Sequence, residues 1–138
     1  MKSIRPYYLI TFLLLLLACS DKLMIVPCGE CVTDEPTSTD IKIRIESDNY
    51  SAVTLKVYRG PIEDNILLDS IVTSALEFSY KADINTHYTF SAEYKDQNGR
   101  TIIAIDSAYP RVRFETQQCD NDCYYIYDNK VNLRIRYE

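Results

Sequence analysis

The chain has 138 residues, which suits one domain with a modest core, and it contains twelve tyrosines and no tryptophan. The formal net charge is −5 at pH 7, and this acidic balance argues against nucleic acid as a partner, because phosphates need a basic face. The chain has no glycine-rich phosphate loop, and its single histidine, His87, lies in no pattern typical of a Ser/His/Asp or Cys/His site. We therefore expect a non-catalytic protein without a cofactor.

The first eighteen residues have the pattern of a secretory signal. Lys2 and Arg5 form a short positive head, and residues 7–18 are apolar apart from Thr11. The run is too short to span a bilayer, which needs about 20 apolar residues. We expect residues 1–18 to be removed, which would leave 120 residues with a net charge of −7.

The signal ends in the letters LLAC, residues 16–19, which resemble the lipobox of bacterial lipoproteins. The resemblance implies a diacylglycerol on the sulfur of Cys19, cleavage before this residue and acylation of the new amine. Ser20 follows, and in the lipoprotein family this favours the outer membrane over the inner one. We therefore expect a lipid-anchored protein of the bacterial cell envelope, facing either the periplasm or the outside. The alternative is an ordinary secretory peptide with a cysteine near its cut site.

Residues 19–40 are expected to form the acylated N-terminus and a flexible tether. One short apolar patch, residues 23–26, precedes the polar, turn-prone letters TDEPTSTD at residues 33–40. No helical period runs through this segment.

Alternation of apolar and polar residues takes over after the tether and recurs to the end of the chain. Period two is typical of antiparallel sheets with one face in the core, and no segment has a sustained helical stripe. Turn signals separate the alternating segments; Asn98-Gly99 is the strongest. We predict an all-β, antiparallel β-sandwich of about seven to eight strands within residues 41–138, with strands in 41–46, 53–59, 76–81, 87–95, 101–114 and 131–138.

Residues 76–100 resemble the E strand, corner and F strand of a fibronectin type III or immunoglobulin-like domain, and residues 53–60 resemble its C strand. The resemblance implies that Tyr88 is the corner tyrosine, whose hydroxyl ties the E–F crossing to nearby backbone. It also implies a G strand in residues 101–114, interrupted at Pro110, which cannot donate to a ladder. The core tryptophan of the fibronectin pattern is absent, and residues 116–138 continue past the last expected strand. A prealbumin-like sandwich is the alternative.

The other four cysteines form two close pairs, Cys28 with Cys31 and Cys119 with Cys123. Three chemistries fit them: structural disulfides, a four-thiolate zinc site, and redox exchange, since CGEC resembles a thioredoxin-type motif. An oxidising envelope compartment favours disulfides, and four cysteines allow three pairings. We expect the tether pair to bond to the C-terminal pair. The alternative function, a metal- or redox-linked envelope protein, depends on the same four residues.

One further segment points to binding. If residues 123–129 form a strand, Tyr125 and Tyr127 share a face, and exposed aromatic residues suit contacts with another envelope protein or a glycan. The alternative is that they pack onto the sandwich.

The acidic letters DND, residues 120–122, with Glu115 and Asp128 nearby, are a candidate Ca²⁺ site, with a solvated loop as the alternative. We expect a membrane-tethered binding or structural accessory module at the outer membrane or cell surface.

Overall fold

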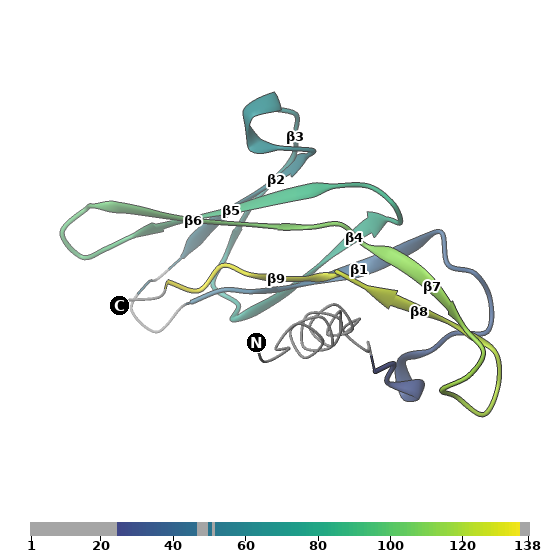
Figure 1. Ribbon diagram of the computed structural model, residues 1–138. Coiled ribbons are helices and arrows are strands. Elements are labelled where there is room, and N and C mark those ends of the chain that lie inside the picture. The colour runs from purple at the N-terminus through teal and green to yellow at the C-terminus, as the bar shows by residue number, and fades with distance from the viewer. Residues whose placement is uncertain (1–24, 47–49, 51, 136–138) are drawn as a thin grey trace, which may run out of the picture.

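The computed structural model describes residues 25–46, 50 and 52–135, and within them the chain forms nine β-strands (Figure 1). The only helices in these ranges are two single turns of 3₁₀ helix, η1 (Cys28–Glu30) and η2 (Ile62–Asp64). In this part of the chain, neither turn is long or apolar enough to cross a membrane. The prediction of an all-β sandwich is confirmed. The signal residues and Cys19 lie outside the described ranges.

The larger sheet has four antiparallel strands in the order β3-β2-β5-β6. Its central strands, β2 and β5, direct valine, leucine, phenylalanine and tyrosine side chains alternately into the core, as the sequence pattern predicts. The strands are β3 (Leu67–Thr73), β2 (Val53–Arg59), β5 (Tyr88–Lys95) and β6 (Thr101–Ala108).

The second sheet has three strands in the order β4-β1-β9, in which β4 is antiparallel to β1 and β9 is parallel to it. Its strands are β4 (Glu77–Asp83), β1 (Ser38–Arg44) and β9 (Lys130–Asn132). The predicted C-terminal strand is therefore short within the described residues. It still contributes buried Val131, and Leu133 just beyond it is also buried.

The core lies between these two sheets and draws on every strand of both except β3. A fully buried Val, Leu, Ile or Phe side chain contributes about 1.5–3 kcal/mol relative to an exposed one, so this cluster is the main source of stability. Its completely buried large side chains are Tyr94, Phe90, Ile41, Ile43, Ile45, Leu55, Leu133, Val53 and Val57.

The strand order agrees with the immunoglobulin-like arrangement. The segments compared above with the C, F and G strands, β2, β5 and β6, are neighbours in one sheet. The segment compared with the E strand, β4, pairs with β1 in the other sheet, where the B strand of that fold lies. One strand of the larger sheet, β3, was not among the segments that we predicted.

The corner between β4 and β5 is closed by a tyrosine hydroxyl. The ring of Tyr88 is 3% exposed, and its Oη accepts a hydrogen bond of 3.1 Å from the backbone N–H of Asp83. The bond spans the turn that carries the chain from one sheet to the other. Tyr88 therefore occupies the position, and makes the kind of bond, that the sequence resemblance implies.

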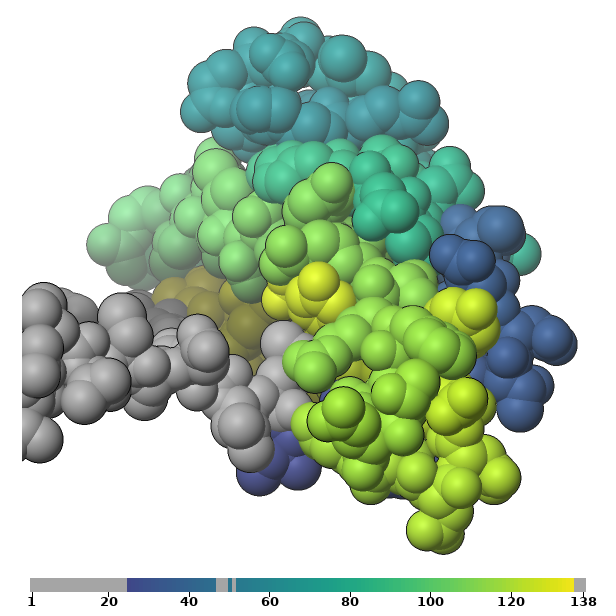
Figure 2. Space-filling model, turned by 45° about the vertical axis from the view of Figure 1, so that its right-hand side comes forward, coloured from purple at the N-terminus to yellow at the C-terminus, as the bar shows by residue number. Residues whose placement is uncertain are grey.

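Residues 101–114 are interrupted at Pro110 as expected, but the two pieces form strands of different sheets and not one G strand. Strand β6 ends at Ala108, and after Pro110 the chain enters β7 (Arg111–Glu115), which pairs only with β8 (Cys123–Tyr127) among the described strands. Pro110 has no N–H to donate, and its carbonyl accepts a bond of 2.8 Å from Asn85. Figure 2 shows the β7–β8 hairpin (lime to yellow) projecting below the body of the sandwich.

Candidate functional site

The β7–β8 hairpin places the predicted tyrosines beside two arginines. In its antiparallel register Arg111 lies opposite Tyr127, and Arg113 lies opposite Tyr125. Side chains directly opposite each other in such a pair share a face. One face of the hairpin therefore presents two arginines and two tyrosines, and we call these four residues the Arg/Tyr face. Both tyrosines are half-buried, between the exposed and the packed alternatives.

Arg111 organises this face. Its guanidinium lies over the rings of Tyr127 and Tyr109, with its central carbon 4.8 Å and 5.4 Å from the two ring centroids. It also forms an ion pair of 2.5 Å with Asp128. Cation–π contact and a carboxylate together hold the Arg111 side chain on a partly exposed surface. Such a surface can stack on a flat partner and donate hydrogen bonds around its rim.

The opposite face of the hairpin lines a groove of about 560 Å³ against the sandwich. Phe114 is 53% exposed, and its ring centroid is 4.9 Å from that of Tyr124. The remaining walls come from the segment before β1 and from the turn after β4; the groove is lined by Glu35, Pro36, Thr37, Ile84, Asn85, Val112, Phe114 and Tyr124. Aromatic groups are thus accessible on both faces of the hairpin.

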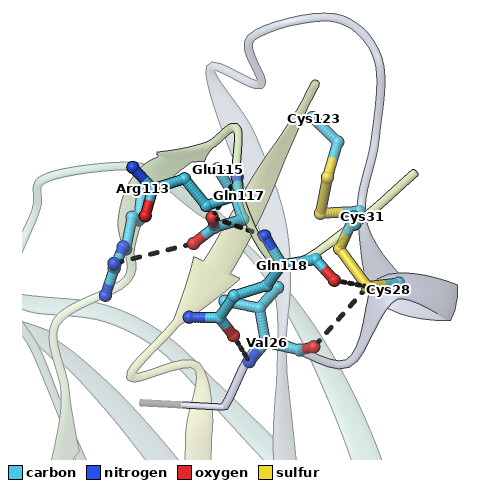
Figure 3. The surroundings of a disulfide bond; sticks show 9 residues. Val26, Cys28, Cys31, Arg113, Glu115, Gln117, Gln118 and Cys123 are labelled. Carbon is cyan, nitrogen blue, oxygen red and sulfur yellow. Dashed lines mark hydrogen bonds and ion pairs between the residues drawn. A yellow bond between two sulfur atoms is a disulfide. The ribbon is translucent and has the colours of Figure 1, made fainter. Parts of the chain in front are cut away.

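Two disulfides join the tether to this hairpin (Figure 3). Cys28 bonds to Cys119 and Cys31 bonds to Cys123, with Cα–Cα distances of 5.6 Å and 5.5 Å. These distances lie within the range of native disulfides. The expected pairing, tether to C-terminal segment, is confirmed, and we call the two bridges the cysteine clamp.

Backbone contacts reinforce the clamp. Val32 and Tyr124 exchange two backbone hydrogen bonds, of 3.0 Å and 2.7 Å, so the tether adds a short antiparallel bridge to β8. Val26 is 4% exposed, and its N–H donates to the side-chain oxygen of Gln118 at 2.9 Å. Residues 26–32 are therefore docked against the hairpin by burial and hydrogen bonds as well as by sulfur.

Glu115 holds the loop between β7 and β8. Its carboxylate is buried and accepts backbone hydrogen bonds from Gln117 at 2.8 Å and Gln118 at 3.1 Å. These hydrogen bonds, of which the one from Gln117 has the largest effect, hold the pKa of the Glu115 carboxyl below its ordinary value. The second oxygen makes no hydrogen bond within the described residues and faces Arg113 at 3.6 Å.

The candidate calcium site is not assembled. Glu115 is engaged by backbone amides and Asp128 by Arg111, and no three carboxylates converge anywhere in the described ranges. The one group of potential metal ligands found there consists of the sulfurs of Cys31, Cys119 and Cys123, which lie within 4.8 Å of one another. That proximity follows from two adjacent disulfides.

His87 lies next to Tyr109 just before β5. Its ring is half-buried, 6.5 Å from the ring of Tyr109 between centroids, and its Nδ1 has no hydrogen-bond partner in this part of the chain. Its carbonyl accepts a bond from Gly60, which places it at the entry to β5.

Sequence reasoning missed Tyr109, Arg111 and Arg113 as parts of the site. Alternation in the letters RVRF, residues 111–114, places the two arginines on one face, but it does not show that this strand pairs with the tyrosine strand. That pairing depends on the chain leaving the larger sheet at Pro110.

No protein-family model matches the chain, and neither curated proteins nor solved structures give a significant match. The fold and the site define the class: a β-sandwich whose projecting hairpin is clamped to the N-terminal segment by two disulfides.

Proposed function

We propose that the protein is a non-catalytic lipoprotein of the bacterial cell envelope, a binding or structural accessory module at the outer membrane or cell surface. The observation that carries the proposal is the cysteine clamp. Disulfides form and persist in oxidising compartments, and the clamp follows closely after a segment with the features of a lipoprotein signal. Secretion, lipidation at Cys19 and disulfide bonding are all consistent with one location, the bacterial cell envelope.

The Arg/Tyr face is the proposed contact surface. Tyrosine and arginine are enriched where proteins bind other proteins, because both offer large contact area with a polar end. Here Arg111 contacts the rings of Tyr127 and of the neighbouring Tyr109, which is 40% exposed, and pairs with Asp128, so contacts within the protein hold its side chain. An ordered surface loses less conformational entropy on association. The partner is another envelope protein or a glycan.

The clamp keeps this surface close to the anchor. Cys28 lies nine positions after Cys19, and a fully extended chain spans at most about 3.3–3.6 Å per residue. The hairpin bonded to Cys28 would therefore stay within about 30 Å of the lipid. A module of this kind would meet its partner at the membrane rather than at a distance from it.

The lipid anchor is tested by replacing Cys19 with Ala in the full-length chain. The variant should accumulate as an unacylated, uncleaved or mis-sorted precursor, whereas the matched change Ser20→Ala should leave a cleaved, lipid-bearing protein in the membrane fraction. Membrane fractionation and intact mass measure both. If the Cys19→Ala protein stays with membranes at its mature mass, the lipoprotein assignment is wrong.

The alternative function is a metal- or redox-linked envelope protein that uses Cys28, Cys31, Cys119 and Cys123. Its support is the convergence of three of the sulfurs within 4.8 Å, which would let reduced thiols close around a zinc ion. It requires the thiols to be free, and the two bridges occupy all four.

A further inference from the structure

The two bridges of the cysteine clamp differ in their exposure to solvent. In the first bridge Cys28 is exposed and Cys119 is half-buried. In the second bridge Cys31 is half-buried and Cys123 is buried, with 6% of its surface exposed. Thiol–disulfide exchange requires access to the sulfur that is attacked. A reductant in solution therefore opens the Cys28–Cys119 bridge first, by attack on Cys28.

Attack on Cys28 releases Cys119 as a thiolate, and the surroundings of Cys28 favour this direction. The sulfur of Cys28 lies 3.4 Å from the carbonyl oxygen of Gln118 and 3.8 Å from that of Val26 (Figure 3). Two carbonyl oxygens repel a negative charge on this sulfur, and they can accept a hydrogen bond from a neutral thiol. Reduced Cys28 is therefore held as a thiol, and Cys119 is the nucleophile that remains.

The sulfur of Cys119 lies next to the second bridge. It and the sulfurs of Cys31 and Cys123 are within 4.8 Å of one another, and the sulfur of Cys28 is not a member of this group of described ligand atoms. A nucleophile held beside its target reacts far faster than one that must arrive by diffusion. A Cys119 thiolate can therefore attack the Cys31–Cys123 bridge from inside the protein, where a reductant in solution has little access.

Burial favours one of the two products of this attack. Attack on Cys123 forms a Cys119–Cys123 bond and releases Cys31 as a thiolate, whereas attack on Cys31 would release Cys123. Burial disfavours a thiolate, and a thiol that ionises more readily leaves faster. Half-buried Cys31 is therefore a better leaving group than buried Cys123. The new bond joins residues four positions apart in the hairpin loop, and the tether keeps no covalent link to it.

We propose that the clamp is a disulfide relay with Cys119 as its internal nucleophile, so that one molecule of a dithiol reductant detaches the tether at both bridges. The dithiol breaks the Cys28–Cys119 bond, is oxidised to its disulfide, and leaves a Cys28 thiol and a Cys119 thiolate. The Cys119 thiolate then attacks Cys123, and Cys31 leaves and takes up a proton. The protein gains two electrons and two protons in total, and one disulfide, Cys119–Cys123, remains.

Release lengthens the connection between the domain and the anchor. In the clamped form Cys28 is bonded to the hairpin nine positions after Cys19. In the released form the first strand residue is Ser38, nineteen positions after Cys19. At about 3.3–3.6 Å per extended residue, the maximum reach grows from about 30 Å to about 65 Å. This consequence rests on the proposed lipid at Cys19, whereas the exchange between the cysteines does not.

Two serine variants of the full-length protein in detergent test the role of Cys119 without any reductant. Cys28→Ser leaves Cys119 as a free thiol beside the second bridge, and the matched control Cys119→Ser leaves Cys28 free instead. After incubation at pH 8, free thiols are alkylated and the links are mapped by peptide mass spectrometry. Most Cys28→Ser molecules should carry an alkylated Cys31 and a Cys119–Cys123 link, and Cys119→Ser should keep its Cys31–Cys123 link. Circular dichroism should show both variants folded.

Limited reduction tests the relay in the wild-type protein. The probe is one equivalent of tris(2-carboxyethyl)phosphine, which reduces a disulfide and is converted to its oxide. At pH 5 thiols are protonated and exchange is slow, so alkylation at this pH should mark Cys28 and Cys119. If the pH is raised to 8 before alkylation, the marked residues should be Cys28 and Cys31, with Cys119 linked to Cys123.

Four results would overturn the proposal. The first is that Cys119 stays the free thiol at pH 8, in Cys28→Ser or in reduced wild type. The second is a Cys31–Cys119 link, which would keep the tether attached. The third is loss of the Cys31–Cys123 link in Cys119→Ser, which would make Cys28 the nucleophile. The fourth is alkylation of Cys31 and Cys123 at pH 5, which would mean that the buried bridge opens first.

Discussion

Individual side chains hydrogen-bond to the backbone at the turns that connect the strands of this protein. Tyr88 and Glu115 each use oxygen to satisfy backbone amides where the chain changes sheet or reverses direction. Buried amides without partners are costly, so such residues stabilise by far more than their contact area suggests. The role of Tyr88 was accessible from the sequence because its strand, spacing and corner follow a known pattern. The role of Glu115 was not, because it depends on the shape of the loop after it.

Tyr88→Phe should lower the free energy of unfolding by about 1–2 kcal/mol, because it leaves the N–H of Asp83 without its acceptor and keeps the ring in place. Urea denaturation followed by tyrosine fluorescence or circular dichroism measures the change. Tyr58→Phe is the matched control, since Tyr58 is 8% exposed and its hydroxyl makes no hydrogen bond within the described residues. Equal midpoints for Tyr88→Phe and wild type would show that the hydrogen bond between Tyr88 and Asp83 does not contribute to stability.

Glu115 makes the hairpin loop sensitive to acid. Its carboxyl has a lowered pKa in the folded protein, because the ionised form accepts the amides of Gln117 and Gln118. A lowered native pKa stabilises the fold above the unfolded value, about 4.3 for glutamate, and this contribution disappears as the pH falls through the native pKa.

Glu115→Gln should therefore destabilise the protein at pH 7, and the difference from wild type should shrink as the pH falls below about 4. Thermal unfolding midpoints at several pH values measure it. Glu63→Gln, at an exposed residue of η2, is the control and should follow wild type throughout. A difference that is the same at pH 7 and at low pH would show that the Glu115 charge does not act through these bonds.

At the scale of elements, alternation predicted the strands that bury one face and missed β3. β1, β2, β4 and β5 contribute alternate buried residues, and their segments were recognised. β3 reads LLDSIVT and is exposed or half-buried at every position, so no alternating pattern marks it. Its strand character comes from pairing with β2, a long-range contact that a local pattern does not encode.

The hairpin depends on covalent closure. Each bridge links residues more than 90 positions apart, 91 for Cys28–Cys119 and 92 for Cys31–Cys123. Closing such a loop removes conformational entropy from the unfolded chain, which in the chain-entropy account is worth about 4–5 kcal/mol. Once one bridge is made, the second closes only the few residues between the two bridges, so its own contribution is smaller.

Non-reducing digestion and mass spectrometry should therefore find tether peptides linked to peptides containing Cys119 or Cys123, with no free thiols and no zinc. Reducing both bridges should lower the free energy of unfolding by about 2–5 kcal/mol, and replacing only Cys31 and Cys123 with serine should cost a minor part of that. Links confined to Cys28–Cys31 and Cys119–Cys123 would contradict the clamp. Four free thiols with one equivalent of zinc would favour the metal-linked alternative.

The whole molecule consists of a two-sheet sandwich and a projecting β7–β8 hairpin, which two disulfides bond to the N-terminal segment. The fold class was predictable, because period-two patterns constrain it, whereas four cysteines allow three pairings and the sequence alone does not choose between them. The position of the Arg/Tyr face was not predictable, since it depends on where Pro110 turns the chain out of the larger sheet. The clamp bonds the hairpin that carries the proposed contact surface to Cys28, although the two segments are about ninety residues apart in sequence.

The clamp also decides how the molecule would carry mechanical load. A partner that pulls on the hairpin, against a lipid at Cys19, would stretch a path that leaves the hairpin through the Cys28–Cys119 bond and reaches Cys19 nine positions before Cys28. That path contains no strand of the sandwich. Tension would be borne by covalent bonds, and β1, which follows the clamp, would not be peeled from its sheet. Under reducing conditions the same pull would pass through β1 and the core, and the domain would unfold at lower force.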